Sequence, residues 1–177
     1  MAIRRILQLG DPLLRTRSTP VSHLDAAPVL ADLRDTLHEF QRTHGFGRGI
    51  AAIQIGEPVR CVYLEINGQA YSLINPEFTI MSEEKARKWD DCFSFPQLMV
   101  YVERSRKVTM LYLDEHGVWQ ELDAEDAFAE LLQHELDHLD GILSIDRALD
   151  AQTGFCTREE WLRRHRSAPA PARSAAT

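Results

Sequence analysis

Two histidines and a glutamate in residues 133–138 are spaced for metal-dependent hydrolysis. His134 and His138 lie four residues apart, so on a helix both imidazoles leave the same face and can bind one metal ion. Glu135 lies beside them, where its carboxylate can reach a water molecule on such an ion. On spacing alone, a helix with two surface histidines remains the alternative.

A catalytic metal site needs a third protein ligand and one open position. Cys92 is the best candidate, because it lies in a polar segment between strand-like stretches. Cys61 falls in an apolar strand pattern and Cys156 precedes the last predicted helix, so both are expected to be buried structural residues. Three widely spaced cysteines fit poorly with a disulfide framework and favour reduced thiols.

Residues 47–56 combine three glycines and two alanines with one amide side chain, Gln54. Small residues let another backbone approach closely, which predicts a substrate-facing loop or strand. The alternative is a tight turn in which Gln54 is solvated.

Hydrophobic spacing predicts the elements that position these residues. Residues 24–43 carry apolar side chains at helical intervals and stop at Gly45. Residues 59–118 shorten to strand-length pieces separated by turn signals. Residues 124–140 return to a helical period, with Asp123 as the expected N-cap and Gly141 as the stop. Apolar residues cover most of this second helix, which predicts that it is buried in the domain centre.

The two ends of the chain are less regular. Residues 6–21 have no sustained period and are predicted to form an extended arm over the domain. Thr157 and Glu160 fit a capping box for a short helix reaching about Arg166. We expect a single domain over residues 1–166 and a disordered tail over residues 167–177.

Composition narrows the functional classes. A formal net charge of -7 over 177 residues argues against a broad nucleic-acid-binding surface. No apolar run approaches the roughly 18 residues of a membrane span, and the first residues lack the apolar core of a secretion signal. We therefore expect a cytoplasmic protein without a membrane or nucleic-acid partner.

Together, the three segments resemble the motifs of the peptide deformylase family. The family motifs G-x-G-x-A-A-x-Q-x-G, E-G-C-x-S and Q-H-E-x-D-H are matched, in order, by residues 47–56, 90–94 and 133–138. The resemblance implies an α+β fold in which antiparallel β-sheets surround a central metal-binding helix. It also implies a metal-dependent hydrolase that removes the N-formyl group from N-formylmethionyl peptides or nascent proteins and releases formate.

The resemblance extends to the cofactor and to individual residues. It implies one divalent metal, iron(II) in the native family enzymes, although zinc, nickel or cobalt could occupy the same ligands. The metal would be held by Cys92, His134 and His138, with Glu135 as the proton shuttle. The oxyanion would be stabilised by the Gln54 side-chain amide and the backbone N–H of Phe93.

Three charged residues are expected to support the metal site. Asp90 would pair with Arg104 and brace the cysteine segment, and Asp137 would orient a ligand or hold the helix in place. An ordinary solvated pair remains the alternative for Asp90 and Arg104.

The substrate side departs from the family pattern. Asp91 stands where the motif has glycine and Arg48 where an aliphatic residue is usual, and these two residues and Gly49 are expected to face the substrate. Two arrangements remain open. Arg48 pairs with Asp91 across the cleft, or Arg48 binds a substrate carboxylate bidentately. The second arrangement suggests a deformylase for a small N-formylated amino acid or metabolite.

The expected partners follow from these alternatives. They are an N-formylated peptide or small formamide substrate, and nascent chains at the ribosome. A third hypothesis for the function is a non-catalytic deformylase-like binding protein. A fourth is a zinc protease, but this hypothesis rests on the His-Glu-Leu-Asp-His pattern alone.

Overall fold

The computed structural model describes residues 2–66 and 68–165, so the expected tail over residues 167–177 lies outside the described residues. One antiparallel sheet has five strands in the order β1-β2-β3-β6-β7 and the other has three in the order β4-β5-β8. The larger sheet contains β1 (Gly49–Ala51), β2 (Cys61–Ile66), β3 (Gln69–Met81), β6 (Lys107–Leu113) and β7 (Trp119–Glu125). The smaller contains β4 (Lys85–Asp91), β5 (Leu98–Ser105) and β8 (Phe155–Thr157).

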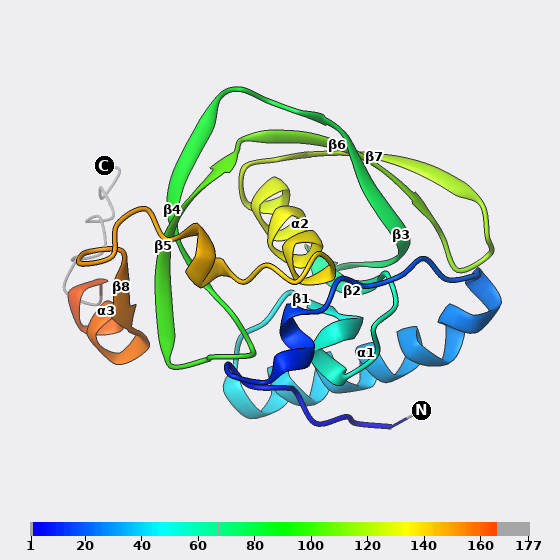
Figure 1. Cartoon of the computed structure of the whole chain (residues 1–177), viewed down its shortest axis with the longest axis horizontal. Helices are drawn as coiled ribbons and strands as arrows, with labels where there is room; N and C mark the ends of the chain where they lie inside the picture. Colours follow the sequence, from blue (N-terminus) through cyan, green and yellow to red (C-terminus); the bar gives the residue numbers. More distant parts are fainter. Residues whose placement is uncertain (1, 67, 166–177) are drawn as a thin grey trace, which may run out of the picture.

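The central element is α2 (Asp126–Leu139), which lies between strands of both sheets (Figure 1). Its side chains from Ala129 to Leu139 are all buried, and its apolar residues share a core with β1, β2, β3 and β6. The other face of the larger sheet packs against α1 (His23–His44). The predicted α+β fold with a buried central helix is therefore confirmed.

The ends of α1 follow from local chemistry. Ser22 is the N-cap, and its side chain accepts a hydrogen bond from the backbone N–H of Asp25. Gly45 adopts a left-handed conformation with φ 76° and closes the helix with a bond to the carbonyl of Gln41. The helix predicted to stop at Gly45 is thus confirmed.

The start of α2 differs from the prediction. Ala124 and Glu125 belong to β7, where they pair with Val108 and Lys107, and the N-cap is Glu125. The expectation that Asp123 caps the helix is wrong, because Asp123 lies within the strand and accepts a bond from the Thr109 hydroxyl. Strand pairing and burial of Ala124 outweigh its helical propensity. The end was predicted correctly, since Gly141 follows α2 with φ 73°.

The N-terminal arm is mostly extended, but it contains a 3-10 helix, η1 (Pro12–Arg15), that was not predicted. Asp11 caps this turn through a bond from the N–H of Leu13, and proline at its first position suits a helix start. Before this turn, the N–H groups of Leu7 and Leu9 donate to the carbonyls of Gln54 and Ser94. The arm is therefore hydrogen-bonded to both residues 47–56 and residues 90–94, the first two motif segments.

The last described helix is α3 (Arg158–His165), which follows β8 directly. The N–H of Glu160 donates to the Thr157 hydroxyl at 3.2 Å, which is one half of the predicted capping box. Its predicted end at Arg166 lies outside the described residues.

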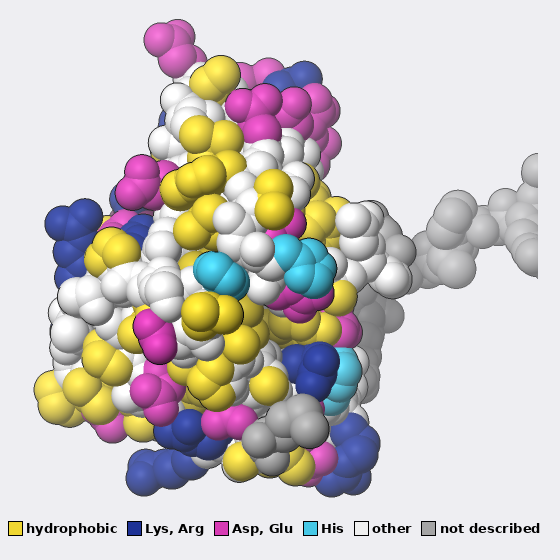
Figure 2. All heavy atoms as spheres, turned by 90° about the vertical axis from the view of Figure 1, so that its right-hand side faces the viewer, with side chains coloured by type: hydrophobic (Ala, Val, Ile, Leu, Met, Phe, Trp, Pro, Cys, Tyr) yellow, Lys and Arg dark blue, Asp and Glu magenta, His cyan; other side chains and the backbone are white. Residues whose placement is uncertain are grey.

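The surface mixes side-chain types. On the face drawn in Figure 2, Lys and Arg side chains lie in separate groups, with acidic and apolar side chains between them. Within residues 2–66 and 68–165, no helix combines the length and apolar character needed to cross a bilayer.

Candidate metal centre

Cys92, His134 and His138 come together inside the domain. The Nε2 atom of His138 lies 3.2 Å from the Sγ atom of Cys92 and 3.2 Å from the Nε2 atom of His134. All three side chains are buried, and their ligand atoms lie within 4.8 Å of one another. The two imidazoles leave one face of α2, as their four-residue spacing predicts, while Cys92 follows the end of β4.

The donor set suits a divalent ion. Four-coordinate geometry with metal–nitrogen distances near 2.1 Å and metal–sulfur distances near 2.3 Å sets ligand atoms about 3.4–3.6 Å apart, close to the separations found here. Three lone-pair donors facing one another in a buried site satisfy each other poorly by hydrogen bonding. The Oε2 atom of Glu135 also has no hydrogen-bond partner among the described residues. A metal ion would bind the three facing donor atoms, and a water molecule at its open coordination position would give the Glu135 carboxylate a hydrogen-bond partner.

Asp90 orients the first histidine. Its Oδ2 atom lies 2.9 Å from Nδ1 of His134, which favours a proton on Nδ1 and leaves Nε2 free to bind a metal. Burial alone would lower the pKa of His134, but the negative charge of Asp90 and the hydrogen bond between them raise it well above its ordinary value. Burial, together with the positive charge of His134, lowers the pKa of His138. Asp90 therefore makes His134 the more basic of the two imidazoles.

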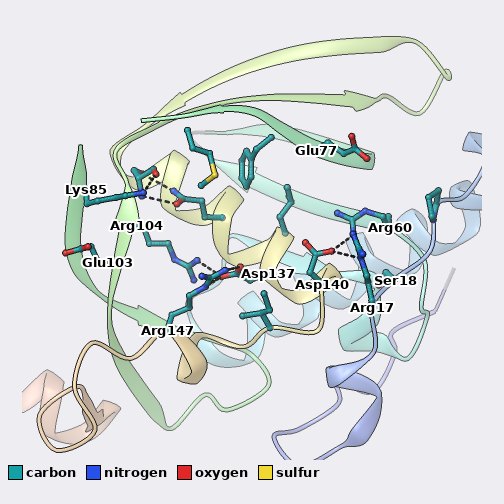
Figure 3. A pocket seen from close by; sticks show the side chains of 17 residues that line it. Arg17, Ser18, Arg60, Glu77, Lys85, Glu103, Arg104, Asp137, Asp140 and Arg147 are labelled. Atoms are coloured by element: carbon teal, nitrogen blue, oxygen red, sulfur yellow. Dashed lines mark hydrogen bonds and ion pairs between the residues drawn. The ribbon is translucent and has the colours of Figure 1, made fainter. Parts of the chain in front are cut away.

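A second layer of charge lies behind Asp90. Arg104 is almost fully buried and donates to Asp90 at 3.1 Å. It also donates to Asp137 at 2.5 Å, and Asp137 accepts a further bond from Arg147 (Figure 3). The pairing predicted between Asp90 and Arg104 is present and buried rather than solvated. Burial would raise the pKa of Asp90, but the charges of His134 and Arg104 keep it well below its ordinary value. Asp90 therefore remains an anion able to orient His134.

A cavity of about 600 Å³ lies on a different face of α2 from His134 and His138, and Figure 3 shows the side chains that line it. Arg104 and Asp137 line one part of it, and Arg60, Asp140 and Arg17 form a second group of charges. The candidate ligands Cys92, His134 and His138 do not line it.

Glu135 lies beside the ligand cluster and is 3% exposed. Burial raises the pKa of this carboxyl to about 7, with smaller opposing effects from the neighbouring charges. The glycine at position 49 makes room for it, because a Cβ atom there would lie 2.7 Å from Oε1 of Glu135. A carboxylate with a pKa near neutrality can both accept and return a proton.

Gln54 reaches the cluster from the short 3-10 helix η2 (Ala52–Ile55), which follows β1. Its Nε2 atom lies 3.7 Å from Sγ of Cys92 and 3.3 Å from Oγ of Ser94, and its Oε1 atom accepts from the N–H of Ala51. The alternative in which Gln54 is solvated is wrong, because the side chain is buried. Phe93 also borders the cleft, and its ring stacks on that of Phe40 at 3.7 Å between centroids.

The cleft above these residues has a volume of about 350 Å³. Arg48, Gly49 and Asp91 line it, as expected for substrate-facing residues. Arg48 and Asp91 do not pair with each other. Arg48 donates to Glu130 at 3.0 Å, while Asp91 accepts from Arg158 at 2.5 Å. Of the two arrangements left open, the pairing of Arg48 with Asp91 across the cleft is therefore wrong, because each residue has another partner that is distant in sequence.

Several residues of the site were missed by the sequence analysis. Glu130 could have been found, because it lies one helical turn before His134 and so on the same face of α2. Lys88, which also contacts Glu130, and Arg158 carry no motif that distinguishes them from surface charges. The guanidinium of Arg158 also lies 3.8 Å from the centre of the Phe46 ring and so connects two walls of the cleft.

Comparison with known proteins identifies the family. A family model described as polypeptide deformylase matches residues 3–153, most of the chain. The chain belongs to the polypeptide deformylase family. It is 39% identical to the peptide deformylase of Bartonella tribocorum over 153 residues, which cover 82% of this chain and 84% of that protein.

Solved structures of peptide deformylases share the fold. The enzyme from Thermotoga maritima superposes with a TM-score of 0.79 at 31% sequence identity, covering 85% of this chain and all of that one. A class I type b peptide deformylase from Acinetobacter baumannii with Met-Ala-Ser bound gives a TM-score of 0.73 at 29% identity, covering 82% of this chain and 98% of that one. These likenesses favour a peptide deformylase enzyme over the small-molecule and binding-protein alternatives. They confirm metal dependence as a family property, with Cys92, His134 and His138 as the candidate site.

Proposed function

We propose that this protein hydrolyses the N-formyl group of N-formylmethionyl peptides and releases formate. The observation that carries the proposal is the convergence of one cysteine and two histidine side chains beside a buried glutamate in a cleft. The motif order and the deformylase relatives support the same reaction.

The metal site would be formed by Cys92, His134 and His138, and we propose iron(II) as its native occupant. When bound there, a divalent ion supplies Lewis acidity that activates water and polarises the formyl carbonyl. These three ligands would also accept zinc, nickel or cobalt. Asp90 keeps the imidazole of His134 oriented toward the ion.

Glu135 would move the proton. Its carboxylate accepts a proton from the attacking water and then returns one to the nitrogen of the leaving amine, so the formyl C–N bond breaks and formate and a free amine form. A pKa raised to about 7 suits both transfers near neutral pH.

Gln54 and Phe93 would stabilise the negative charge that develops on the formyl oxygen. The Nε2 atom of Gln54 is held near the metal ligands by its contacts with Cys92 and Ser94. The backbone N–H of Phe93, which directly follows Cys92, would supply the second donor. Loss of one such donor typically lowers kcat by about 10²- to 10³-fold.

The natural substrate would be a formylated nascent peptide. The Acinetobacter baumannii relative has been solved with Met-Ala-Ser bound, and the same sequence with a formyl group is the simplest test peptide. We propose that the protein acts in the cytoplasm on chains emerging from the ribosome, where reduced cysteines such as Cys92 persist.

Formate release from formyl-Met-Ala-Ser tests the proposal. Protein is prepared anaerobically with iron(II), because both the thiolate and the ion are oxidisable. We expect Glu135-dependent formate release, lost in Glu135→Ala while the metal stays bound. Full turnover in Glu135→Ala would contradict the role of this residue, and peptide-bond cleavage without formate would point to a protease.

A further inference from the structure

The cleft beside the candidate metal ligands contains an ion pair between a half-buried arginine and a buried glutamate, which the deformylase reaction does not require. The Nη2 atom of Arg48 lies 3.0 Å from Oε2 of Glu130, and Nζ of Lys88 lies 3.2 Å from the same oxygen. Arg48 also donates to the carbonyl of Ala127 through Nη1. Both Arg48 and Glu130 line the cleft.

This pair lies next to the reaction centre. Glu130 is one turn before His134 on α2. One of its carboxylate oxygens lies within 4.8 Å of a carboxylate oxygen of Asp90 and of a ring nitrogen of His134. The rest of the cleft wall is partly apolar, with the side chains of Phe46, Phe93 and Leu131. A substrate side chain that enters this end of the cleft therefore meets apolar surface and a pair of opposite charges.

Of the two charges, Arg48 is the one a ligand can reach. The Glu130 side chain is 4% exposed, whereas that of Arg48 is 40% exposed. Both terminal nitrogens of Arg48 carry two N–H groups each, and the contacts with Glu130 and Ala127 engage one from each. The remaining N–H groups of Arg48 can therefore donate to an acceptor on the substrate. An apolar substrate side chain would exclude water from these N–H groups without offering them a hydrogen bond in its place.

The charge around Arg48 selects a neutral acceptor over a carboxylate. Burial works against the charged form of Arg48, but the negative charges of Glu130, Asp91 and Asp90 outweigh it and raise the pKa of the guanidinium. Each of these carboxylates already has a cation: Glu130 contacts Arg48 and Lys88, and Arg158 and Arg104 contact Asp91 and Asp90. A substrate carboxylate would have to compete with them for cations that are already paired. An amide or sulfoxide oxygen accepts the same hydrogen bond without adding a further negative charge.

We propose that Arg48, held by Glu130, makes this cleft prefer formylated peptides whose first side chain ends in a neutral hydrogen-bond acceptor, such as glutamine or methionine sulfoxide. The preference is over wholly apolar side chains of equal length. Methionine, whose sulfur is a weak acceptor, falls between the two. This inference rests on the proposed deformylase function and specifies its substrate class.

The test compares formyl-Gln-Ala-Ser with formyl-norleucyl-Ala-Ser, whose first side chains are similar in length, using the iron(II) holoenzyme. We expect kcat/KM for the glutamine peptide to be at least tenfold higher, and formyl-Glu-Ala-Ser to fall below the glutamine peptide. Formyl-Met-Ala-Ser and its sulfoxide give the same comparison at a thioether. We expect the sulfoxide to be the better substrate.

The triple variant Arg48→Leu, Lys88→Leu, Glu130→Leu removes the pair together with the second cation on Glu130, so that no charge of this cluster is left without its partner. In this variant we expect the norleucine peptide to become the better substrate. The matched control is Arg87→Leu, Glu103→Leu, which removes the ion pair between β4 and β5 and leaves the preference as it is. Circular dichroism and metal content establish that each variant is folded and loaded.

The possible outcomes separate the two proposals. If no peptide yields Glu135-dependent formate, the proposed function fails. If formate is released but norleucine equals or exceeds glutamine in the unmodified protein, the inference about Arg48 fails while the function stands. A glutamate peptide turned over faster than the glutamine peptide would overturn the choice of a neutral acceptor.

Discussion

Gly49 and Glu135 lie in direct contact, although one is on a strand and the other on the central helix. A Cβ atom at position 49 would lie 2.7 Å from Oε1 and 3.1 Å from the carboxyl carbon of Glu135. Only a residue without a side chain therefore leaves Glu135 room beside the candidate metal ligands.

Gly49→Ala is accordingly expected to displace the Glu135 carboxylate while sparing the metal ligands. A shift of about 1 Å in a reacting group can lower the rate about 10²-fold. We expect kcat for formyl-Met-Ala-Ser to fall by about that factor, with metal content and fold retained. Position 49 has no left-handed φ, so backbone strain does not confound the result. Wild-type kcat in this variant would contradict the close contact.

Asp90→Asn is expected to weaken metal binding. The amide keeps the size of the side chain but removes the charge that orients and polarises His134. Loss of such a partner typically lowers metal affinity about 10- to 100-fold, which competition with a chromophoric chelator measures. Asp123→Asn makes the same charge change at an exposed position of β7 and serves as the control. Equal affinity in both variants would show that Asp90 is not needed to orient the ligand.

Removing the metal should destabilise the protein as well as stop formate release. An ion that binds only the folded state at one hundred times its Kd stabilises it by about 2.7 kcal/mol. We expect urea unfolding with a chelator to show a loss of about that size, with activity restored by iron(II). Cys92→Ser should show a much smaller metal effect, while Cys156→Ser, which changes a thiol outside the cluster, should keep it. Unfolding that does not depend on metal in the wild-type protein would argue against the ion site.

Cys61 predicts how stability changes at alkaline pH. Burial raises the pKa of its thiol from 9.0 to about 12. Above pH 9 the unfolded chain therefore loses this proton while the folded protein keeps it. The contribution of this thiol to the free energy of unfolding is fully present below pH 9. It falls as the pH rises toward 12, by up to about 1.4 kcal/mol per pH unit.

Urea unfolding at pH 8, 9 and 10 measures this dependence. Cys61→Ala should lose this part of the alkaline slope, although it also lowers stability at every pH because it leaves a cavity. Val62→Ala truncates a neighbouring buried side chain that does not titrate, and it should keep the full slope. An unchanged slope in Cys61→Ala would show that the thiol ionises as readily when folded.

Local pattern was enough to predict the parts of the molecule that depend on near neighbours in the chain. The four-residue spacing of His134 and His138 places them on one helix face whatever surrounds the helix. Gly45 and Gly141 end their helices because the left-handed conformation they adopt is easy for glycine. The motif segments and their order were likewise sufficient to predict the family and its fold.

Tertiary structure alone decided the features that join distant parts of the chain. Asp123 is a strand residue because residues 107–113 are available to pair with it, which no local propensity records. The partner of Arg48 is Glu130 rather than Asp91, because β1 packs against α2 while Arg158 reaches Asp91 from the last helix. Sequence spacing determines which face a side chain leaves, but an ion pair depends on which charged groups folding brings within a few ångströms.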